Sequence, residues 1–177
     1  MGRNGLAVRS DGVLIGVPNL LVVPGGGWVD GEPKGVRAQI ARGTLLDVIQ
    51  RVHQRGSVVA GVCTGAMALA TAGILDRRPA TTHHLALQDL RKTGACVVTS
   101  RVVDAGDVVT CAGVTASLDL SLWLVERFWG LQAAEAVSRQ LEYQRSPDVY
   151  VEMERAKWGV VIGAREHPEP RNEQHAI

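Results

Sequence analysis

The stretch VVAGVCTGAMALA, residues 58–70, joins an apolar run typical of a buried strand to a run of small residues typical of a helix. At the junction, Gly61, Cys63 and Gly65 have the Gly-x-nucleophile-x-Gly spacing of a nucleophile elbow, a sharp strand-to-helix turn. Glycines relieve crowding around the strained central residue of such a turn. Amides that open the following helix favour a thiolate at Cys63 and supply donors for an oxyanion. A buried cysteine that acts as a small hydrophobe is the alternative, but the flanking glycines favour a nucleophile.

The composition is that of one globular domain with a substantial core. The chain has 177 residues, of which 46% are hydrophobic and 21% are charged. Nineteen basic and eighteen acidic residues leave a net charge of +1. Without a basic stripe or an aromatic ladder, we expect no nucleic-acid partner. The N-terminus has no long apolar run, and no apolar run approaches the roughly 20 residues that span a bilayer, so we expect a soluble, cytoplasmic protein that does not bind membranes.

The three cysteines, Cys63, Cys96 and Cys111, are odd in number and lack CxxC spacing. This pattern indicates neither a disulfide framework nor a zinc site, and reduced thiols are expected. We interpret Cys96 and Cys111 as thiols buried in strands rather than as resolving partners of Cys63. No metal and no cofactor are predicted.

Strands and helices alternate along the chain. Leu20 to Pro24 is a continuous apolar run that predicts a strand buried on both faces. Thr44 is expected to cap a helix through about His53, and the elbow helix is expected to stop near Gly73. The later predicted elements are strands at 80–83, 96–99 and 108–111, the last two paired around Gly106, and helices at 85–92, 115–128 and 131–143. This order predicts an α/β fold, a three-layer sandwich around a mostly parallel sheet.

The pattern weakens toward the C-terminus. Residues 148–157 are predicted to form a short helix, and residues 167–177 are polar with little to bury. We therefore divide the chain into one α/β domain, residues 1–143, and a C-terminal helix with a mobile tail, residues 144–177.

Four segments follow one another along the chain: Val23-Pro24-Gly25-Gly26, Val62-Cys63-Thr64-Gly65, Ala80-Thr81-Thr82-His83, and Gly113-Val114-Thr115-Ala116 with Asp119. In this order they resemble the ThiJ/PfpI superfamily, relatives of class I glutamine amidotransferases with a flavodoxin-like sheet. The resemblance is strongest to the isonitrile hydratase branch, and Gln140-Leu141-Glu142-Tyr143 also resembles that branch.

The resemblance implies roles for the matching residues. Cys63 would be the nucleophile, and the Thr64 amide with an amide from Gly25 or Gly26 would hold the developing negative charge. The Thr64 hydroxyl would lie close to the thiol. His83 would line the pocket, and a purely structural role for His83 is an equal alternative. Thr115 and Asp119 would support the site, the latter by bonding backbone nearby.

One part of the family pattern is missing. Members begin with a strand, a helix and a strand before the Pro-Gly-Gly loop, and the acid that partners the cysteine lies in that unit. Here 23 residues precede Pro24, and we do not transfer the acid to Asp11. Either the assigned start lies too far downstream, or the chain is truncated at its N-terminus and lacks that general acid/base.

Several functions agree with these residues. The resemblance implies hydration of isonitriles to N-substituted formamides, although other members act on peptides, glyoxals or glycated groups, and it implies a homodimer. A catalytically impaired ligand-binding or redox-sensing protein is the alternative. A glutamine amidotransferase triad that uses His167-Pro168-Glu169 is less favoured, because Ala66 and Met67 follow the elbow where that class has a glutamine.

Overall fold

The computed structural model describes residues 7–31 and 33–152. A five-stranded sheet has the order β1-β2-β6-β5-β7. All neighbouring strands are parallel except β5 and β6, which are antiparallel. The strands of this sheet are β1 (Leu20–Val23), β2 (Val58–Gly61), β5 (Val102–Asp104), β6 (Val108–Cys111) and β7 (Val149–Val151).

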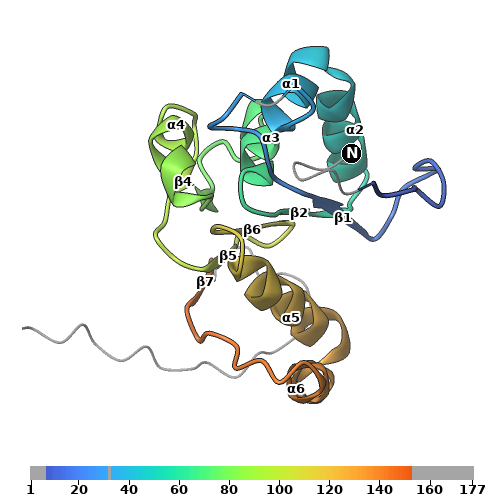
Figure 1. Cartoon of the computed structure of the whole chain (residues 1–177), viewed down its shortest axis with the longest axis vertical. Coiled ribbons are helices and arrows are strands. Elements are labelled where there is room, and N and C mark those ends of the chain that lie inside the picture. Colours follow the sequence, from blue (N-terminus) through green and yellow to red (C-terminus); the bar gives the residue numbers. More distant parts are fainter. Residues whose placement is uncertain (1–6, 32, 153–177) are drawn as a thin grey trace, which may run out of the picture.

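Helices cover both faces of the sheet and complete three layers (Figure 1). One face packs against α1 (Val36–Arg42), α2 (Thr44–Gln54) and α3 (Gly65–Thr71), and the other packs against α5 (Ala116–Trp129), which contacts α6 (Leu131–Gln140). A second sheet pairs β3 (Pro79–Ala80) with β4 (Cys96–Val97), and between them lie a 3-10 turn (His84–Ala86) and α4 (Leu87–Arg91). The predicted α/β sandwich with a mostly parallel sheet is therefore confirmed.

The strand at Leu20 to Val23 is less buried than its sequence predicts. Only Val23 is fully buried, and Val22 is 45% exposed. The reason is position, because β1 pairs with β2 on one side and lies at the edge of the described sheet. Residues 7–17, which precede β1, are exposed along their whole length.

The pairing expected around Gly106 involves a different strand. Gly106 lies at φ +86 in the turn between β5 and β6, so the partner of residues 108–111 is Val102–Asp104 rather than 96–99. Cys96 and Val97 instead pair in parallel with β3, and Cys96 is exposed, which corrects its interpretation as a buried thiol. Residues 96–99 fit a strand equally well by composition, and only packing against β3 decides their partner.

The prediction of a short helix at residues 148–157 is wrong for residues 148–152, which are the part that the structure describes. Val149–Val151 forms β7, which runs parallel to β5. Its position is held by Asp148, whose side-chain oxygens accept hydrogen bonds from Ser100 Oγ and, at 2.9 Å, from the Arg101 amide. The alternating Val-Tyr-Val suits a strand once a sheet edge is available. The remainder of the predicted helix and tail, including His167, lies outside the described residues.

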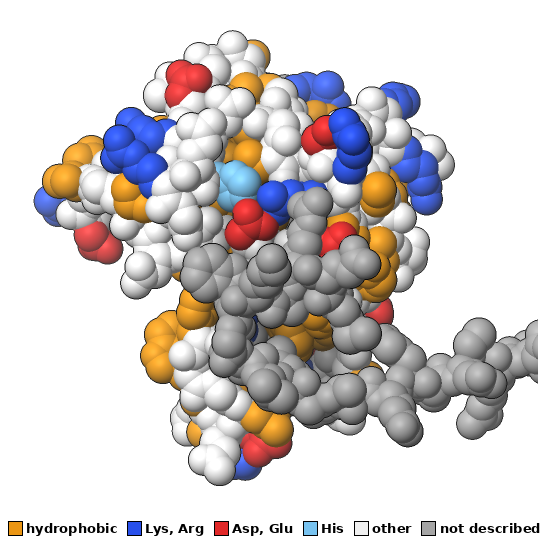
Figure 2. Space-filling view, turned by 180° about the vertical axis from the view of Figure 1, so that it is seen from behind, with side chains coloured by type: hydrophobic (Ala, Val, Ile, Leu, Met, Phe, Trp, Pro, Cys, Tyr) orange, Lys and Arg blue, Asp and Glu red, His pale blue; other side chains and the backbone are white. Residues whose placement is uncertain are grey.

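Charge is distributed without a single-sign field on the face shown in Figure 2, where acidic and basic side chains are interspersed. Among the described residues, no helix is long and apolar enough to cross a membrane.

Candidate active site

Cys63 lies in a strained elbow between β2 and α3. Its φ is +54, a left-handed conformation that costs a non-glycine residue roughly 1–2 kcal/mol. Its side chain is partly accessible. The flanking glycines are required by close packing, because a Cβ at Gly65 would lie 2.1 Å from the Val23 carbonyl oxygen and one at Gly61 would lie 3.0 Å from Ala66. The elbow predicted from residues 58–70 therefore has the expected backbone geometry.

Thr64 joins the elbow to the loop after β1. Its Oγ1 accepts a 2.8 Å hydrogen bond from the Gly26 amide. A Cβ at Gly25 would lie 2.7 Å from the Thr64 nitrogen, so the loop backbone packs directly on the elbow. The Gly26 amide is thus engaged by a protein acceptor, whereas the Thr64 hydroxyl still has a proton to donate.

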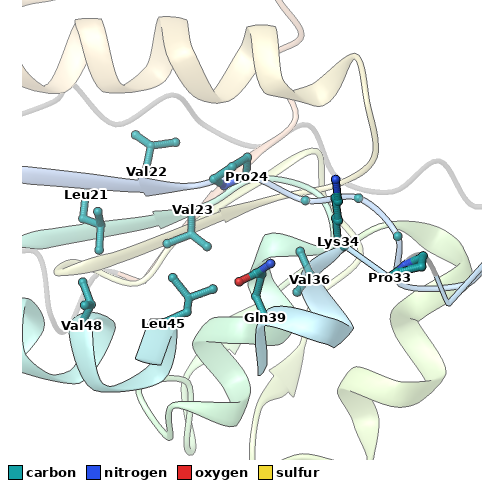
Figure 3. A pocket seen from close by; sticks show the side chains of 14 residues that line it. Leu21, Val22, Val23, Pro24, Pro33, Lys34, Val36, Gln39, Leu45 and Val48 are labelled. Carbon is teal, nitrogen blue, oxygen red and sulfur yellow. The ribbon is translucent and has the colours of Figure 1, made fainter. Parts of the chain in front are cut away.

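A cavity of about 580 Å³ runs along β1 and continues beside Gly25, Gly26 and Gly27. Figure 3 shows Leu21 and Val23 pointing toward α1 and α2, while Val22 points to the opposite face of the sheet. Most of the lining is apolar, with Lys34 and Gln39 at the loop end. Of the predicted site residues, Gly25 and Gly26 line this cavity, and Gly25 also contacts Thr64.

His83 follows Thr82, which connects this segment to the elbow. Thr82 is buried, and its Oγ1 donates a 2.9 Å hydrogen bond to the Cys63 carbonyl. The His83 ring packs so closely on Gly113 that a Cβ there would lie 2.5 Å from Cδ2. Burial and the adjacent His84 lower the pKa of His83, which favours the neutral ring. His83 Nδ1 accepts a 3.3 Å hydrogen bond from the Leu85 amide, so the ring proton is placed on Nε2.

Asp119 of α5 is buried and accepts hydrogen bonds from three other residues. Its carboxylate accepts hydrogen bonds from Arg101 Nε at 2.7 Å, Tyr143 Oη at 3.1 Å and the Ser146 amide at 2.7 Å. Arg101 also donates to Thr115 Oγ1 at 3.3 Å. Asp119 thus bonds the backbone at Ser146, in the segment after α6, and it also pairs with Arg101, which directly precedes β5. The hydrogen bond from Arg101 to Asp119 raises the pKa of the Arg101 guanidinium.

Two residues near the elbow, Thr82 and Cys111, are not among the predicted site residues. Thr82 was part of a recognised segment, but its bond to Cys63 depends on the approach of β3 to the elbow. Cys111, at the end of β6, is fully buried, as predicted. It lies close enough to Cys63 for that residue to influence its acidity. Burial raises the pKa of the Cys111 thiol to about 11.

An acid/base partner for Cys63 is not evident in the part of the chain that the structure describes. Asp11 lies in the exposed segment before β1, and Asp119 is occupied by Arg101. The described residues contain no group of three or more metal-ligating side chains.

The geometry defines a class of α/β protein with a cysteine at a strand-to-helix elbow. Residues 5–127 match the DJ-1/PfpI family, and the chain belongs to this family. This result confirms the resemblance to ThiJ/PfpI proteins.

Three relatives illustrate the similarity. Isonitrile hydratase of Pseudomonas putida is 37% identical over 132 residues, which are 74% of this chain and 54% of the relative. The HTH-type transcriptional regulator CdhR of Pseudomonas aeruginosa is 35% identical over 144 residues, 79% of this chain and 40% of the regulator. The crystal structure of a ThiJ/PfpI family protein from Pseudomonas syringae has a TM-score of 0.66 and 30% identity, covering 74% of this chain and 52% of that one. The chain thus spans about half or less of the length of these relatives.

Proposed function

We propose that this protein uses Cys63 to add to small electrophilic substrates, with isonitriles as the first class to test. The observation that carries the proposal is the strained backbone of Cys63, held beside a threonine hydroxyl that is fixed by the Gly26 amide. Strain of this kind concentrates at functional sites, because surrounding structure must maintain it. The similarity to isonitrile hydratase over 74% of the chain supports the choice of substrate.

In the proposed reaction the Cys63 thiolate attacks the terminal carbon of the isonitrile, and that carbon takes up a proton to give a thioimidate. Water then adds to the same carbon, and the carbon–sulfur bond breaks. The products are an N-substituted formamide and the free thiolate, so one water molecule is consumed. The Thr64 hydroxyl and amide would stabilise charge on the adduct. His83, whose neutral ring carries its proton on Nε2, is a candidate for proton transfer.

The cavity beside Gly25 supports an apolar substituent on the substrate. Gly25 packs on Thr64 and also lines the cavity, so a substituent that passes this residue would enter a largely apolar space. Burial of such a group contributes about 25 cal/mol for each Å² removed from water. Substrates with larger alkyl or aryl groups should therefore bind more tightly than methyl isonitrile.

The test measures both thiol reactivity and turnover. Iodoacetamide labelling followed by peptide mapping should modify Cys63 faster than Cys96, even though Cys96 is the more exposed thiol. Formamide production from an isonitrile should disappear in Cys63→Ser and persist in Cys96→Ser. Labelling of Cys63 no faster than Cys96, with no formamide, would overturn the proposal.

A second candidate is a ligand-binding or redox-sensing role without turnover. Its support is the 35% identity to a transcriptional regulator and the lack of an evident acid/base partner for Cys63 in the described residues. This candidate predicts a reactive Cys63 and saturable binding of a small ligand, but no formamide. The two functions are separated by the same assay.

We also propose a cytoplasmic homodimer. The support for a dimer is family membership, and the exposed apolar side chains before β1, which include Val13 and Ile15, offer a surface that a second copy would cover. Light scattering on the purified chain distinguishes a monomer from a dimer.

A further inference from the structure

The position of Cys111 in the sheet places a second thiol next to the elbow. Strands β2 and β6 are parallel neighbours, with Gly61 opposite Thr110. Cys63 lies two residues beyond Gly61, and Cys111 lies one residue beyond Thr110. Extension of this register by one residue puts Val62 opposite Cys111. Adjacent strands are about 4.8 Å apart and consecutive Cα atoms about 3.8 Å apart, so on this extension the Cα atoms of Cys63 and Cys111 are at most about 9 Å apart.

The electrostatic surroundings of Cys111 agree with this proximity. The groups that act on its thiol are the backbone amide and thiol of Cys63, the guanidinium of Arg101 and the carboxylate of Asp119. Cys111 is fully buried, and the proposed hydration reaction has no use for it. Cys96, in contrast, is exposed on the separate β3-β4 sheet, so it is a natural control.

We propose, against the interpretation from the sequence alone, that Cys111 is the resolving thiol of Cys63, and that peroxide converts the pair into a reversible disulfide that blocks the nucleophile. This inference rests on the proposed function in one respect, because it requires a reactive Cys63. The structure supports it through a strained residue just beyond the end of β2 and a buried thiol at the end of the neighbouring strand β6.

The chemistry balances with hydrogen peroxide or an organic hydroperoxide as the oxidant. The Cys63 thiolate attacks the terminal peroxide oxygen, the O–O bond breaks, and protonation gives a sulfenic acid plus water or an alcohol. The Cys111 sulfur then attacks the Cys63 sulfur, and the sulfenic oxygen leaves as water. Two thiols and one peroxide thus become one disulfide, and an external dithiol reverses the change.

Closure requires a small movement of the elbow. Disulfide-bonded residues have Cα atoms about 4.4–6.8 Å apart, so a separation of about 9 Å between the Cys63 and Cys111 Cα atoms exceeds this range by roughly 2 Å. Cys63 is the residue best able to move, because departure from its positive φ releases backbone strain. The buried Cys111 thiol is largely protonated at neutral pH, so resolution should be slow and should accelerate at higher pH.

The experiment compares four proteins after peroxide treatment: the unmodified chain, Cys63→Ser, Cys111→Ser and Cys96→Ser. Intact mass and non-reducing peptide mapping report the products. We expect the unmodified chain and Cys96→Ser to lose about 2 Da and to yield a Cys63–Cys111 cross-linked peptide that dithiothreitol reverses. Cys111→Ser should instead gain about 32 Da at Cys63 as the sulfinic acid. Circular dichroism checks that Cys111→Ser is folded, with Cys111→Ala as a second variant.

Two results would overturn the inference. If Cys63 of the unmodified chain proceeds to the sulfinic acid as fast as in Cys111→Ser, Cys111 does not resolve it, and the proposed thiol chemistry stands. If peroxide leaves Cys63 unmodified under conditions that oxidise Cys96, the reactivity of Cys63 is disproved and both proposals fail.

Discussion

Thr64 Oγ1 and the Gly26 amide are joined by a 2.8 Å hydrogen bond that spans 38 residues of sequence. This bond fixes the glycine loop after β1 against the elbow after β2. It also orients the Thr64 hydroxyl, because one lone pair of the oxygen accepts from Gly26 while the hydroxyl proton is free to be donated elsewhere. The two loops therefore act as one unit around Cys63.

Removal of this hydroxyl should impair the reaction more than the fold. In Thr64→Val, kcat/KM for isonitrile hydration should fall by about 100-fold, the usual effect of deleting one donor to a developing charge. Thr64→Ser keeps the hydroxyl and should stay close to the wild-type value. Equal turnover in the Thr64→Val variant and the wild type would remove Thr64 from the proposed mechanism.

The contact of Gly65 with β1 predicts a large loss of stability on substitution. A Cβ at Gly65 would lie 2.1 Å from the Val23 carbonyl oxygen, which is backbone and cannot move aside. Gly65→Ala should therefore lower the free energy of unfolding by about 3 kcal/mol. Gly12→Ala is the matched control, since no atom lies within 4 Å of its Cβ position. Urea unfolding of both variants tests the contrast, and equal midpoints would contradict it.

Asp119 should contribute more to stability than to chemistry. Its buried carboxylate pairs with Arg101 and accepts from Tyr143 and Ser146. Asp119→Ala leaves these donors unpaired and should cost about 3 kcal/mol, whereas the exposed Glu135→Gln should change stability by less than about 0.5 kcal/mol. Urea unfolding measures both. If Asp119→Ala retains stability but loses thiol reactivity at Cys63, the structural role assigned to Asp119 is wrong.

The contacts of Asp107 predict that the free energy of unfolding depends on pH. Burial alone would raise its pKa, but hydrogen bonds from His53 and Arg78, with the Arg78 charge, hold the pKa well below the ordinary value. His53 Nε2 lies 2.8 Å from Oδ2, and Arg78 makes a bidentate pair. Because its pKa is lower in the folded state, ionised Asp107 stabilises the fold at pH values above the unfolded-state pKa of about 3.9. This stabilisation is lost progressively as the pH falls below that value.

The stability difference between the wild type and Asp107→Asn should therefore be full at pH 6–7 and shrink below about pH 4. Urea unfolding at a series of pH values measures this difference. A difference that is constant from pH 7 to pH 3 would show that Asp107 acts through packing rather than through its charge.

Much of this architecture follows from local sequence. The elbow, β1, β2, β6 and the helices at α2, α3, α5 and α6 were predictable because apolar runs, glycine spacing and helical periodicity are local properties. Less predictable were the pairing of residues 96–97 with β3, the strand at Val149–Val151 and the exposure of Val22. Each depends on which strand edge is available, and that is decided by elements distant in sequence.

By itself, the sequence indicated the strand-to-helix elbow at Cys63, because the Gly-x-Cys-x-Gly spacing and the junction of an apolar run with a small-residue run are local signals, and the glycines permit the sharp turn. It also determined the α/β class, through the alternation of buried strands and amphipathic helices. Only the tertiary structure decided that Thr64 engages the Gly26 amide and that Cys111 lies beside Cys63. These are contacts between segments tens of residues apart, and their geometry arises only when parallel strands align their carboxyl ends at one edge of the sheet.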